Sequence, residues 1–400
     1  MGSTKTLLHI DGDAFFASVY QATHAEARGR PVVIGYERGI ATAFSYEAKA
    51  YGVKRGMLIS QVKRLCPGCI IASSDYRIYQ LFSNRIADIV SSYSPYVERY
   101  SIDEVFADMT GLDHMHQESY EGLGRRIKQE IETALGITVS VGIGSTKTIA
   151  KIASSFYKPS GFLMLTSQNV SEYRTQICVQ DIWGIGPRLA VRLKALGIYT
   201  AEDFVQTSKI ILISHFPKPV IQTWYELQGV AQFGLSIGPK TEYQSIQKTR
   251  TLTPPTTNPQ LLLSRIFHHI ESAFSKARKL GYQVEGLSLL LKTQSFHYYT
   301  IEVPLPQPVE YPYLIRSLVK NAFTSLYKPG ELYRTTGCTL YHLHKASLVQ
   351  EQLFDHEKIL KARLRAIYPL YEKKQIRFGS DLFETHRDSS KKLFKLGQIM

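Results

Sequence analysis

Short apolar runs in the first half of the chain predict buried strands. Residues 7–10 and 31–35 are apolar and bounded by turn-forming residues, which is typical of buried strands. Residues 97–109 form two strand-like arms around a polar segment at 101–104. Residues 139–144 alternate small and apolar side chains, which indicates a strand packed close to another backbone.

Helical spacing of apolar positions predicts the helices that accompany these strands. A long amphipathic helix is expected at residues 77–92, and a second at 120–135, which Gly136 ends. Residues 46–65 also have a helical pattern and carry many cations. After Gly161 the pattern changes to that of short helices.

Two later segments have distinctive patterns. Residues 181–193 read as the end of a helix, a Gly-x-Gly turn and a helix opened by Pro187, a residue favoured at the first helical position. From about residue 244 to 345 the order is strand, long helix, two strands, helix and strand. This is the split-βαβ order of a small α+β module. Beyond residue 348 the chain is polar and helical, and then loosely ordered.

The charge of the chain narrows the class of partner. Its 400 residues, enough for two to four domains, carry 48 Lys and Arg against 34 Asp and Glu, a net charge of +14. Such a chain is expected to bind a polyanion, either nucleic acid or an anionic membrane. No apolar run approaches the ~20 residues that span a bilayer, and no secretory signal opens the chain, so nucleic acid in the cytoplasm is favoured. A merely basic surface remains the alternative on charge alone.

The four cysteines do not form a disulfide framework in a chain of this length. Cys66 and Cys69 have C-x-x-C spacing, but Cys178 and Cys338 are isolated in sequence, and no βαβ pattern accompanies the pair. A structural turn is therefore favoured over a zinc or redox site.

Two acidic clusters follow strand-like runs. The first contains Asp11 and Asp13, and the second contains Asp103 and Glu104. Residues two apart in a strand share a face, so Asp11 and Asp13 are candidates to point together. Clustered carboxylates repel one another unless cations neutralise them, and hard oxygen ligands suit magnesium. The alternative is that these acids only end strands, because Asp-Gly is a common turn dipeptide.

Four segments resemble the signature segments of the Y-family, the translesion DNA polymerases. Residues 9–19 (HIDGDAFFASV) and 100–106 (YSIDEVF) are similar to the first and second of these segments. Residues 41–57 resemble the nucleotide-binding fingers segment, and residues 141–159 resemble a fourth stretch. Order and spacing also fit over most of the first 345 residues, so the motifs together are highly specific.

The resemblance implies two-metal nucleotidyl transfer. A primer 3′-hydroxyl would attack the α-phosphate of a deoxynucleoside triphosphate between two Mg²⁺ ions about 3.5–4 Å apart, with Mn²⁺ as a substitute. The catalytic and metal-binding residues would be Asp11, Asp103, Glu104 and, through its backbone carbonyl, Gly12. The nucleotide-binding residues would be Tyr46, Lys49 and Lys158. Lys49 stands where the family often has Arg, so bidentate contact to phosphate is lost there.

The resemblance also implies which residues select the nucleotide. Phe16 falls at the steric-gate position, where a bulky ring excludes a 2′-hydroxyl. Ordinary core packing remains the alternative for one of the pair Phe15 and Phe16. Ile40 and Thr42 would lie over the nascent base pair, and Asp13 is expected to have a structural role.

Two regions are expected to hold primer-template DNA. Gly184 and Gly186, followed by Arg188, have the helix-hairpin-helix form in which backbone N–H groups approach a phosphate. A plain helical turn is the alternative. Residues 243–347 carry twelve Lys and Arg against five Asp and Glu, with aromatic residues interspersed, so a surface that grips duplex DNA is expected.

The fold implied by the resemblance is α+β, with the multidomain right-hand architecture of a polymerase. The resemblance also implies low-fidelity synthesis without a proofreading exonuclease. Its expected parts are the palm at 1–19 and 76–165, the fingers at 20–75, a helical thumb with the helix-hairpin-helix at 166–242, a βαββαβ little finger at 243–347 and a C-terminal tail at 348–400. A non-catalytic DNA-binding scaffold is one rival, against which the intact acids argue. A metal-dependent nuclease is another, but a nuclease needs no triphosphate clamp or sugar gate.

The tail contains a peptide pattern that indicates a partner. Gln350, Leu353 and Phe354 have the Gln-x-x-Leu-Phe form of peptides that dock bacterial polymerases onto the sliding clamp (the β clamp). The alternative is that Leu353 and Phe354 pack onto the preceding domain. The chain is otherwise expected to be a monomer without a membrane partner.

Overall fold

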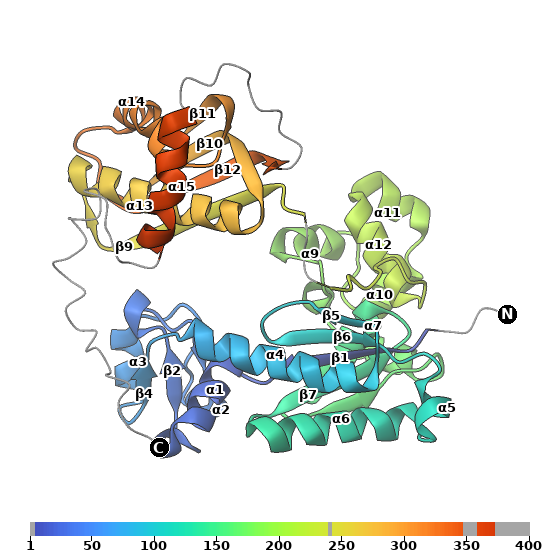
Figure 1. Ribbon diagram of the computed structural model, residues 1–400. Coiled ribbons are helices and arrows are strands. Elements are labelled where there is room, and N and C mark those ends of the chain that lie inside the picture. The colour runs from blue at the N-terminus through green and yellow to red at the C-terminus, as the bar shows by residue number, and fades with distance from the viewer. Residues whose placement is uncertain (1–4, 239–241, 347–357, 373–400) are drawn as a thin grey trace. The chain divides into compact units, whose positions relative to one another are not determined.

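The computed structural model describes residues 5–238, 242–346 and 358–372 of the chain. It divides into two compact units, Met1–Pro239 and Lys240–Met400 (Figure 1). This division lies close to the expected start of the C-terminal module at residue 243. The peptide at Gln350, Leu353 and Phe354 lies outside the described residues.

A five-stranded sheet forms the centre of the first unit, with the strand order β5-β6-β1-β7-β8. Its strands are β1 (Leu7–Gly12), β5 (Val97–Arg99), β6 (Glu104–Asp108), β7 (Val139–Gly144) and β8 (Phe162–Met164). β1 pairs antiparallel with β6 and β7, and β7 pairs parallel with β8. The strands expected at residues 7–10, 97–109 and 139–144 are confirmed. The sequence did not predict β8, which has only three residues.

Helices cover both faces of this sheet, and the residues of β1 are buried on both. Leu8 and Ile10 join a core with residues of α4 (Tyr76–Tyr93) and α6 (Tyr120–Leu135). On the other face His9 contacts Ser154 of α7 (Lys147–Phe156). The helices expected at 77–92 and 120–135 are thus confirmed, and α6 ends at Gly136 as predicted.

A glycine lets α7 approach the sheet closely. A Cβ on Gly142 of β7 would lie 2.2 Å from the carbonyl oxygen of Ala150 and 2.2 Å from the backbone nitrogen of Ser154. No side chain fits at such distances. The sequence-based expectation that residues 139–144 pack against another backbone is therefore confirmed, and the partner is helix α7.

A smaller three-stranded sheet, with the order β3-β2-β4, lies between α1 and α4 in sequence. Its strands are β2 (Val32–Ile34), β3 (Ala43–Phe44) and β4 (Ile70–Ala72). The helices of this region are α1 (Phe15–Thr23), α2 (Tyr46–Ala50) and α3 (Ile59–Leu65), with short 3₁₀ turns at Ala25–Ala27 and Tyr36–Arg38. The helical pattern at residues 46–65 is not one helix. Gly52 and Gly56 have φ of +83° and +88°, so the chain leaves the helix there and re-enters it at Ile59.

The remainder of the first unit consists of short helices, as expected. They are α8 (Val170–Gln176), the 3₁₀ turn η3 (Val179–Asp181), α9 (Pro187–Lys194), α10 (Ala201–Gln206), α11 (Lys209–His215) and α12 (Lys218–Leu227), and an earlier short helix, α5, spans Leu112–His116. Pro187 occupies the first turn of α9, where its missing N–H costs nothing. The helices α8 to α12 share one apolar core with α7 and β8, whereas Leu112 of α5 belongs to the core of the central sheet.

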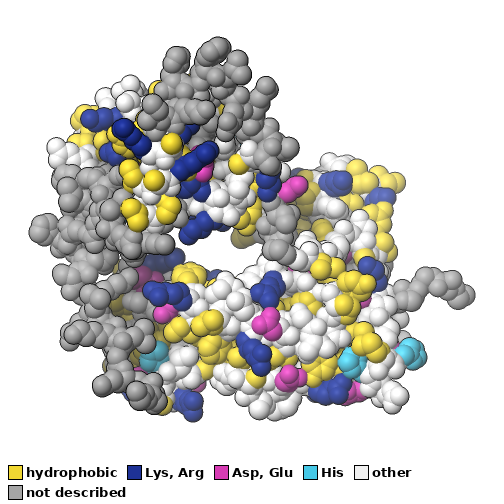
Figure 2. All heavy atoms as spheres, viewed as in Figure 1, with side chains coloured by type: hydrophobic (Ala, Val, Ile, Leu, Met, Phe, Trp, Pro, Cys, Tyr) yellow, Lys and Arg dark blue, Asp and Glu magenta, His cyan; other side chains and the backbone are white. Residues whose placement is uncertain are grey.

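The second unit is a four-stranded antiparallel sheet covered by two helices. In chain order its elements are β9 (Ser245–Thr256), α13 (Pro259–Lys279), β10 (Tyr282–Thr293), β11 (Tyr298–Val309), a 3₁₀ turn at Pro312–Ile315, α14 (Arg316–Leu326) and β12 (Tyr333–Lys345). The predicted split-βαβ order is confirmed, with the strands arranged β11-β10-β12-β9. Figure 2 shows several Lys and Arg side chains on the visible face of this unit.

One further helix follows in the sequence. α15 (Lys358–Glu372) packs Leu364 and Tyr368 against Tyr311 of the second unit. The Tyr368 hydroxyl donates a hydrogen bond to Glu271 at 3.3 Å. The expected helical character of this region is confirmed for these residues. In the part of the chain that the structure describes, no helix combines the length and apolar character needed to cross a membrane.

Candidate active site

Strand register brings the acidic clusters together. Asp11 of β1 lies directly opposite Glu104 of β6, and directly paired residues point to the same face of a sheet. The backbone N–H of Gly12 donates to the carbonyl of Asp103 at 2.9 Å, which fixes the turn before β6 beside the end of β1. The three acids that resemble metal ligands thus lie together where β1 ends and β6 begins, and Asp11 and Glu104 share the face that α7 covers.

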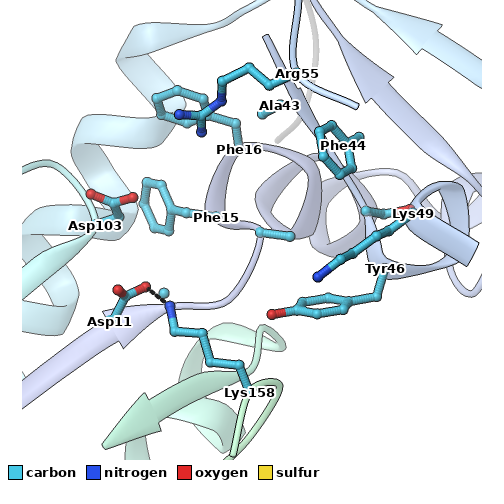
Figure 3. Close-up of a pocket in the computed structure, with 13 residues that line it drawn as sticks. Asp11, Phe15, Phe16, Ala43, Phe44, Tyr46, Lys49, Arg55, Asp103 and Lys158 are labelled. Carbon is cyan, nitrogen blue, oxygen red and sulfur yellow. Dashed lines mark ion pairs between the residues drawn. The ribbon is translucent and has the colours of Figure 1, made fainter. Parts of the chain in front are cut away.

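A cavity of about 340 Å³ opens beside these acids. Figure 3 shows Asp11 and Asp103 on one side of it and Tyr46 and Lys49 on the other. The lining includes seven of the residues singled out from the sequence: Asp11, Gly12, Phe16, Tyr46, Lys49, Asp103 and Lys158. Glu104, Ile40 and Thr42 are not part of this lining, although Glu104 lies next to Asp11 through the strand pairing.

Lysines neutralise two of the carboxylates. The ammonium of Lys158 lies 2.5 Å from an oxygen of Asp11, and Lys151 forms an ion pair with Glu104. Asp103 accepts a hydrogen bond from the hydroxyl of Ser101. Among the described residues, no three His, Cys, Asp or Glu side chains are already arranged to hold a metal ion. Two of the three acids are thus paired with lysines, which lowers the cost of placing like charges together.

The carboxylates have shifted pKa values for distinct reasons. Burial raises the pKa of Asp11 to about 6, assisted by the charges of Glu104 and Asp103 and opposed by Lys158. Burial alone would also raise the pKa of Glu104, but His9 and Lys151 outweigh it and hold that pKa at about 2. A cluster of hard oxygen donors whose negative charges oppose one another is a suitable environment for a divalent cation such as Mg²⁺.

His9 is a buried neighbour of Glu104 that the sequence analysis did not identify. Its Nδ1 lies 2.6 Å from the Ser154 hydroxyl, and its Nε2 lies 3.5 Å from a Glu104 oxygen, which is too long for a strong hydrogen bond. Burial lowers the pKa of His9 to about 4, so the ring is neutral near pH 7. The sequence did contain a signal for His9: it precedes Asp11 by two residues in a strand, and residues two apart share a face.

The two-residue spacing made Asp11 and Asp13 candidates to point together, but in the structure Asp13 has its own set of hydrogen-bond partners. It is buried, and its two carboxylate oxygens accept hydrogen bonds from the Ser140 hydroxyl (2.8 Å) and the Ser160 backbone N–H (2.7 Å). These bonds connect the end of β1 to β7 and to the turn that follows Lys158. Asp13 therefore has a structural role, as the resemblance implied.

Phe15 and Phe16 have different environments at the start of α1. Ala14 has a left-handed conformation (φ 45°) that turns the chain sharply from β1 into α1. Phe15 is 4% exposed and belongs to the main core. Phe16 is half-buried, and its ring stacks on Tyr79 of α4 with centroids 4.4 Å apart. Both rings reach the cavity, but Phe16 has the more accessible side chain.

Tyr46 and Lys49 belong to α2 and line the cavity, and a cap at Ser45 fixes where this helix begins. The Ser45 hydroxyl accepts hydrogen bonds from the backbone N–H groups of Ala48 and Val32, which caps α2 and ties it to β2. Burial raises the pKa of Tyr46 to about 12, with Asp13 and Asp11 adding to the shift, so its hydroxyl remains a hydrogen-bond donor.

The sequence analysis also missed Arg55, which lines the cavity (Figure 3). It lies in the loop that breaks the expected helix at 46–65, and its direction depends on that loop. Ile40 forms an isolated bridge with Leu58, and the Thr42 hydroxyl donates to the carbonyl of Ile34 at 2.9 Å. Both residues belong to the small three-stranded region rather than to the cavity wall.

The predicted hairpin has the expected backbone. Gly184 has a φ of +89°, which favours glycine, and Gly186 is the N-cap residue of α9. Arg188 is exposed in the first turn of that helix. The element before the hairpin is the 3₁₀ turn η3 rather than a full α-helix.

Comparisons with known proteins agree with this fold. The impB/mucB/samB family matches residues 10–155, and the impB/mucB/samB family C-terminal domain matches residues 243–353. DNA polymerase IV of Moorella thermoacetica is 30% identical over 88% of this chain and 90% of that protein. DNA polymerase IV of Listeria monocytogenes serotype 4b is 32% identical over 75% of this chain and 84% of that protein.

Solved structures share the fold. A Y-family DNA polymerase chimera of Dbh and Dpo4 matches with a TM-score of 0.69 and 23% identity over 84% of this chain and 99% of that chain. An insertion ternary complex of Dbh DNA polymerase matches with a TM-score of 0.56 and 22% identity over 84% of this chain and 98% of that chain. The fold and the matched domains define the class as the Y-family DNA polymerases. Within that class, the chain belongs to the impB/mucB/samB family.

Proposed function

We infer that this chain is a template-directed DNA polymerase of the low-fidelity, translesion type, which adds deoxynucleotides to a primer 3′ end. The observation that supports this most strongly is one cavity lined by acids, two lysines, a tyrosine and a phenylalanine, the residue types that would serve as metal ligands, triphosphate clamp and sugar gate. The residues concerned are Asp11, Asp103, Phe16, Tyr46, Lys49 and Lys158. A nuclease has no use for the last four, and a scaffold has no use for the acids.

We propose that the acids hold divalent metal ions, Mg²⁺ with Mn²⁺ as a substitute. Asp11, Asp103 and Glu104 would provide carboxylate oxygens, and Gly12 its backbone carbonyl. When bound, the ions would activate the primer 3′-hydroxyl and neutralise the leaving pyrophosphate. The position of Asp11 supports this assignment: burial raises its pKa, and the charges of Glu104 and Asp103 add to the shift, so a divalent cation would relieve both the desolvation and the repulsion.

The other cavity residues would bind and select the nucleotide. Lys49 and Lys158 carry positive charge that stabilises the triphosphate in the transition state. The Tyr46 hydroxyl, protonated at neutral pH, would donate a hydrogen bond to a phosphate oxygen. Phe16 would lie under the sugar and exclude a 2′-hydroxyl, while Ile40 and Thr42 would lie over the nascent base pair.

We further propose how the chain is divided and how it holds primer-template DNA. The palm would comprise 1–19 and 76–165, the fingers 20–75, the thumb 166–242 and the little finger 243–347. Gly184, Gly186 and Arg188 would contact a phosphate through backbone N–H groups and charge. Such contacts ignore base sequence, as a polymerase requires.

Primer extension with one nucleotide at a time tests this function. The purified chain, a primer-template duplex and a divalent metal ion should yield extension only with the deoxynucleotide that the template specifies, and the primer should not be shortened. Extension opposite a damaged template base should also occur. Primer shortening would favour the nuclease, and DNA binding without any extension would favour the scaffold.

We also propose that the tail residues Gln350, Leu353 and Phe354 dock a bacterial sliding clamp, and that the chain acts in the cytoplasm as a monomer. Changing Leu353 and Phe354 together to Ala should lower clamp affinity and clamp-stimulated synthesis. Clamp-independent insertion of a single nucleotide should stay unchanged, since the residues proposed for chemistry and nucleotide binding all lie between positions 11 and 158. Clamp affinity equal to that of the unchanged chain would refute this proposal.

A further inference from the structure

Trp183 lies where the hairpin of the first unit meets the central sheet. It directly precedes Gly184, one of the two hairpin glycines. Its ring lies roughly parallel to that of Phe106 of β6, with centroids 6.2 Å apart and planes at 27°, and it meets Tyr100 edge to face at 5.5 Å. Phe233 packs against it at 5.6 Å. The hairpin is thus attached to the strand that carries Glu104.

Lys151 connects this cluster of rings to the acidic centre. Its ammonium forms the ion pair with Glu104 and also lies 5.3 Å from the Tyr100 ring and 5.7 Å from the Trp183 ring. Both distances fall within the about 6 Å at which an aromatic face attracts a cation. Lys151 therefore has a carboxylate and two aromatic faces as partners at the same time.

The preceding turn of α7 contains a second lysine in a contrasting position. Lys147 pairs with Glu98 at 2.7 Å, and only 5% of its side chain is exposed. The side chain of Lys151 is 23% exposed. Lys147 is enclosed with Glu98 and with the rings of Tyr100 (5.5 Å) and Phe106 (4.7 Å), whereas Lys151 is more exposed and lies beside the acidic site.

Metal binding and the lysine compete for the same carboxylate. A carboxylate that binds a divalent cation has a stronger counter-charge than an ammonium provides, so its pairing with Lys151 weakens. A displaced ammonium in a partly buried position needs a new partner, because an unpaired charge is costly there. The faces of Tyr100 and Trp183 already lie beside it and offer that partner.

We propose, building on the polymerase function above, that Trp183 is a positioning residue. Together with Tyr100 it provides aromatic faces to which the Lys151 ammonium can bind instead of Glu104. Glu104 is then free to bind metal. Because Trp183 adjoins Gly184, a DNA phosphate bound at the hairpin holds the indole ring in place. DNA binding at the hairpin is in this way coupled to the state of Glu104.

Two substitutions separate the aromatic face from simple packing. Trp183→Leu keeps an apolar side chain without a face for the cation, and Trp183→Phe retains a smaller face. In single-turnover insertion, Trp183→Leu should lower the maximal rate about fivefold, the range expected for a cation–π contact, and Trp183→Phe should recover most of it. The dissociation constants for nucleotide and DNA should change less than twofold. Equal losses in both variants, or a loss in affinity instead of rate, would overturn the proposal.

A matched control uses the other tryptophan of the chain. Trp224 belongs to α12, and its indole N–H donates to the carbonyl of Val205 at 3.1 Å. Trp224→Phe should leave the insertion rate unchanged. Since the chain has two tryptophans, this variant also makes Trp183 the single indole fluorophore.

Fluorescence gives a readout that does not depend on catalysis. With a dideoxy-terminated primer and the Trp224→Phe chain, adding Mg²⁺ should shift the Trp183 emission, because the ammonium of Lys151 moves onto its ring. Adding Lys151→Met to this chain should abolish the shift. No shift with metal, or an equal shift with Lys151→Met, would refute the coupling. If the unchanged chain extends no primer, the proposed function fails instead, so the two failures are distinguishable.

Discussion

The ring of Phe16 is the side chain on which sugar selection should depend. It is half-buried, is supported by stacking on Tyr79, and lines the same cavity as the acids and Lys49. Phe16→Ala removes the bulk that a 2′-hydroxyl would meet. The ratio of ribonucleotide to deoxynucleotide insertion should rise at least about tenfold, which corresponds to about 1.4 kcal/mol of lost discrimination.

Phe15→Ala is the contrasting variant for this prediction. Phe15 is 4% exposed in the main core, so its truncation should lower the free energy of unfolding by about 3–5 kcal/mol. Its effect on sugar choice should be smaller than that of Phe16→Ala. If Phe16→Ala leaves the insertion ratio unchanged while Phe15→Ala raises it, the gate assignment is reversed.

Single residues also show where sequence reasoning succeeds and where it ends. The acids were identifiable because Asp11, Asp103 and Glu104 occur in short motifs that follow strands. Lys151 and Trp183 were not, since their roles depend on how α7 and the hairpin pack against β6. Such contacts join residues distant in sequence, and no local pattern encodes them.

At the scale of elements, the contact between α7 and the central sheet should be highly sensitive to added volume. Gly142→Ala places a Cβ 2.2 Å from two backbone atoms of α7, so one of the two elements must move. The free energy of unfolding should fall by about 3 kcal/mol, measured by chemical or thermal denaturation. Gly68→Ala is the matched control, because no atom lies within 4 Å of its added Cβ and its φ is outside the left-handed region. Equal stabilities for the two variants would contradict this packing.

The sheet–helix contact in the second unit should depend on pH. His269 of α13 is 5% exposed, and its Nε2 lies 3.0 Å from the Thr336 hydroxyl of β12. Burial lowers its pKa from 6.5 to about 4, and nearby positive charges add to the shift. Between these two values the unfolded chain binds a proton that the folded chain does not, so stability falls as pH falls.

The expected loss from His269 is about 3 kcal/mol between pH 6.5 and pH 4. His269→Gln retains a hydrogen-bonding side chain but does not titrate, so its unfolding free energy should fall less steeply over that interval. Denaturant unfolding of both proteins at several pH values measures the difference. Identical pH slopes would show that His269 does not contribute.

Elements were largely predictable where the periodic pattern was long. α4 and α6 lie where the apolar spacing placed them, and the order of strands and helices in the second unit is as expected. The pattern at residues 46–65 misled, since Gly52 and Gly56 interrupt a spacing that is otherwise helical. The short strand β8 (Phe162–Met164) was not predicted from the sequence.

At the scale of the whole molecule, net charge should govern DNA affinity. The chain has a net charge of +14, and the predicted contacts are to phosphates rather than to bases. If six to ten phosphates are contacted, affinity should fall by about 10³–10⁵ between 50 and 200 mM salt, with little dependence on DNA sequence. Fluorescence anisotropy with several duplexes measures both properties. Affinity that is insensitive to salt, or that varies strongly with sequence, would contradict this mode of binding.

The sequence predicted four parts and a tail, among them a basic split-βαβ module that begins at residue 243. The predicted boundary at residue 243 differs by only a few residues from the division after Pro239. The docking of α15 onto the second unit was not predicted, because the apolar spacing of a helix does not reveal which distant surface Leu364 and Tyr368 contact. Their partner, Tyr311, is more than fifty residues away in the sequence.

The central claim is that Asp11, Asp103 and Glu104 support metal-dependent nucleotidyl transfer. The most direct measurement is single-nucleotide primer extension by the unchanged chain and by Asp103→Ala, at matched metal, nucleotide and DNA concentrations, with DNA affinity measured alongside. The unchanged chain should extend the primer only when a divalent metal ion is present. Asp103→Ala should lower the rate at least about a thousandfold, which is about 4 kcal/mol in the barrier, while its DNA affinity stays within twofold. Extension by Asp103→Ala at a near-unchanged rate would contradict the assigned site.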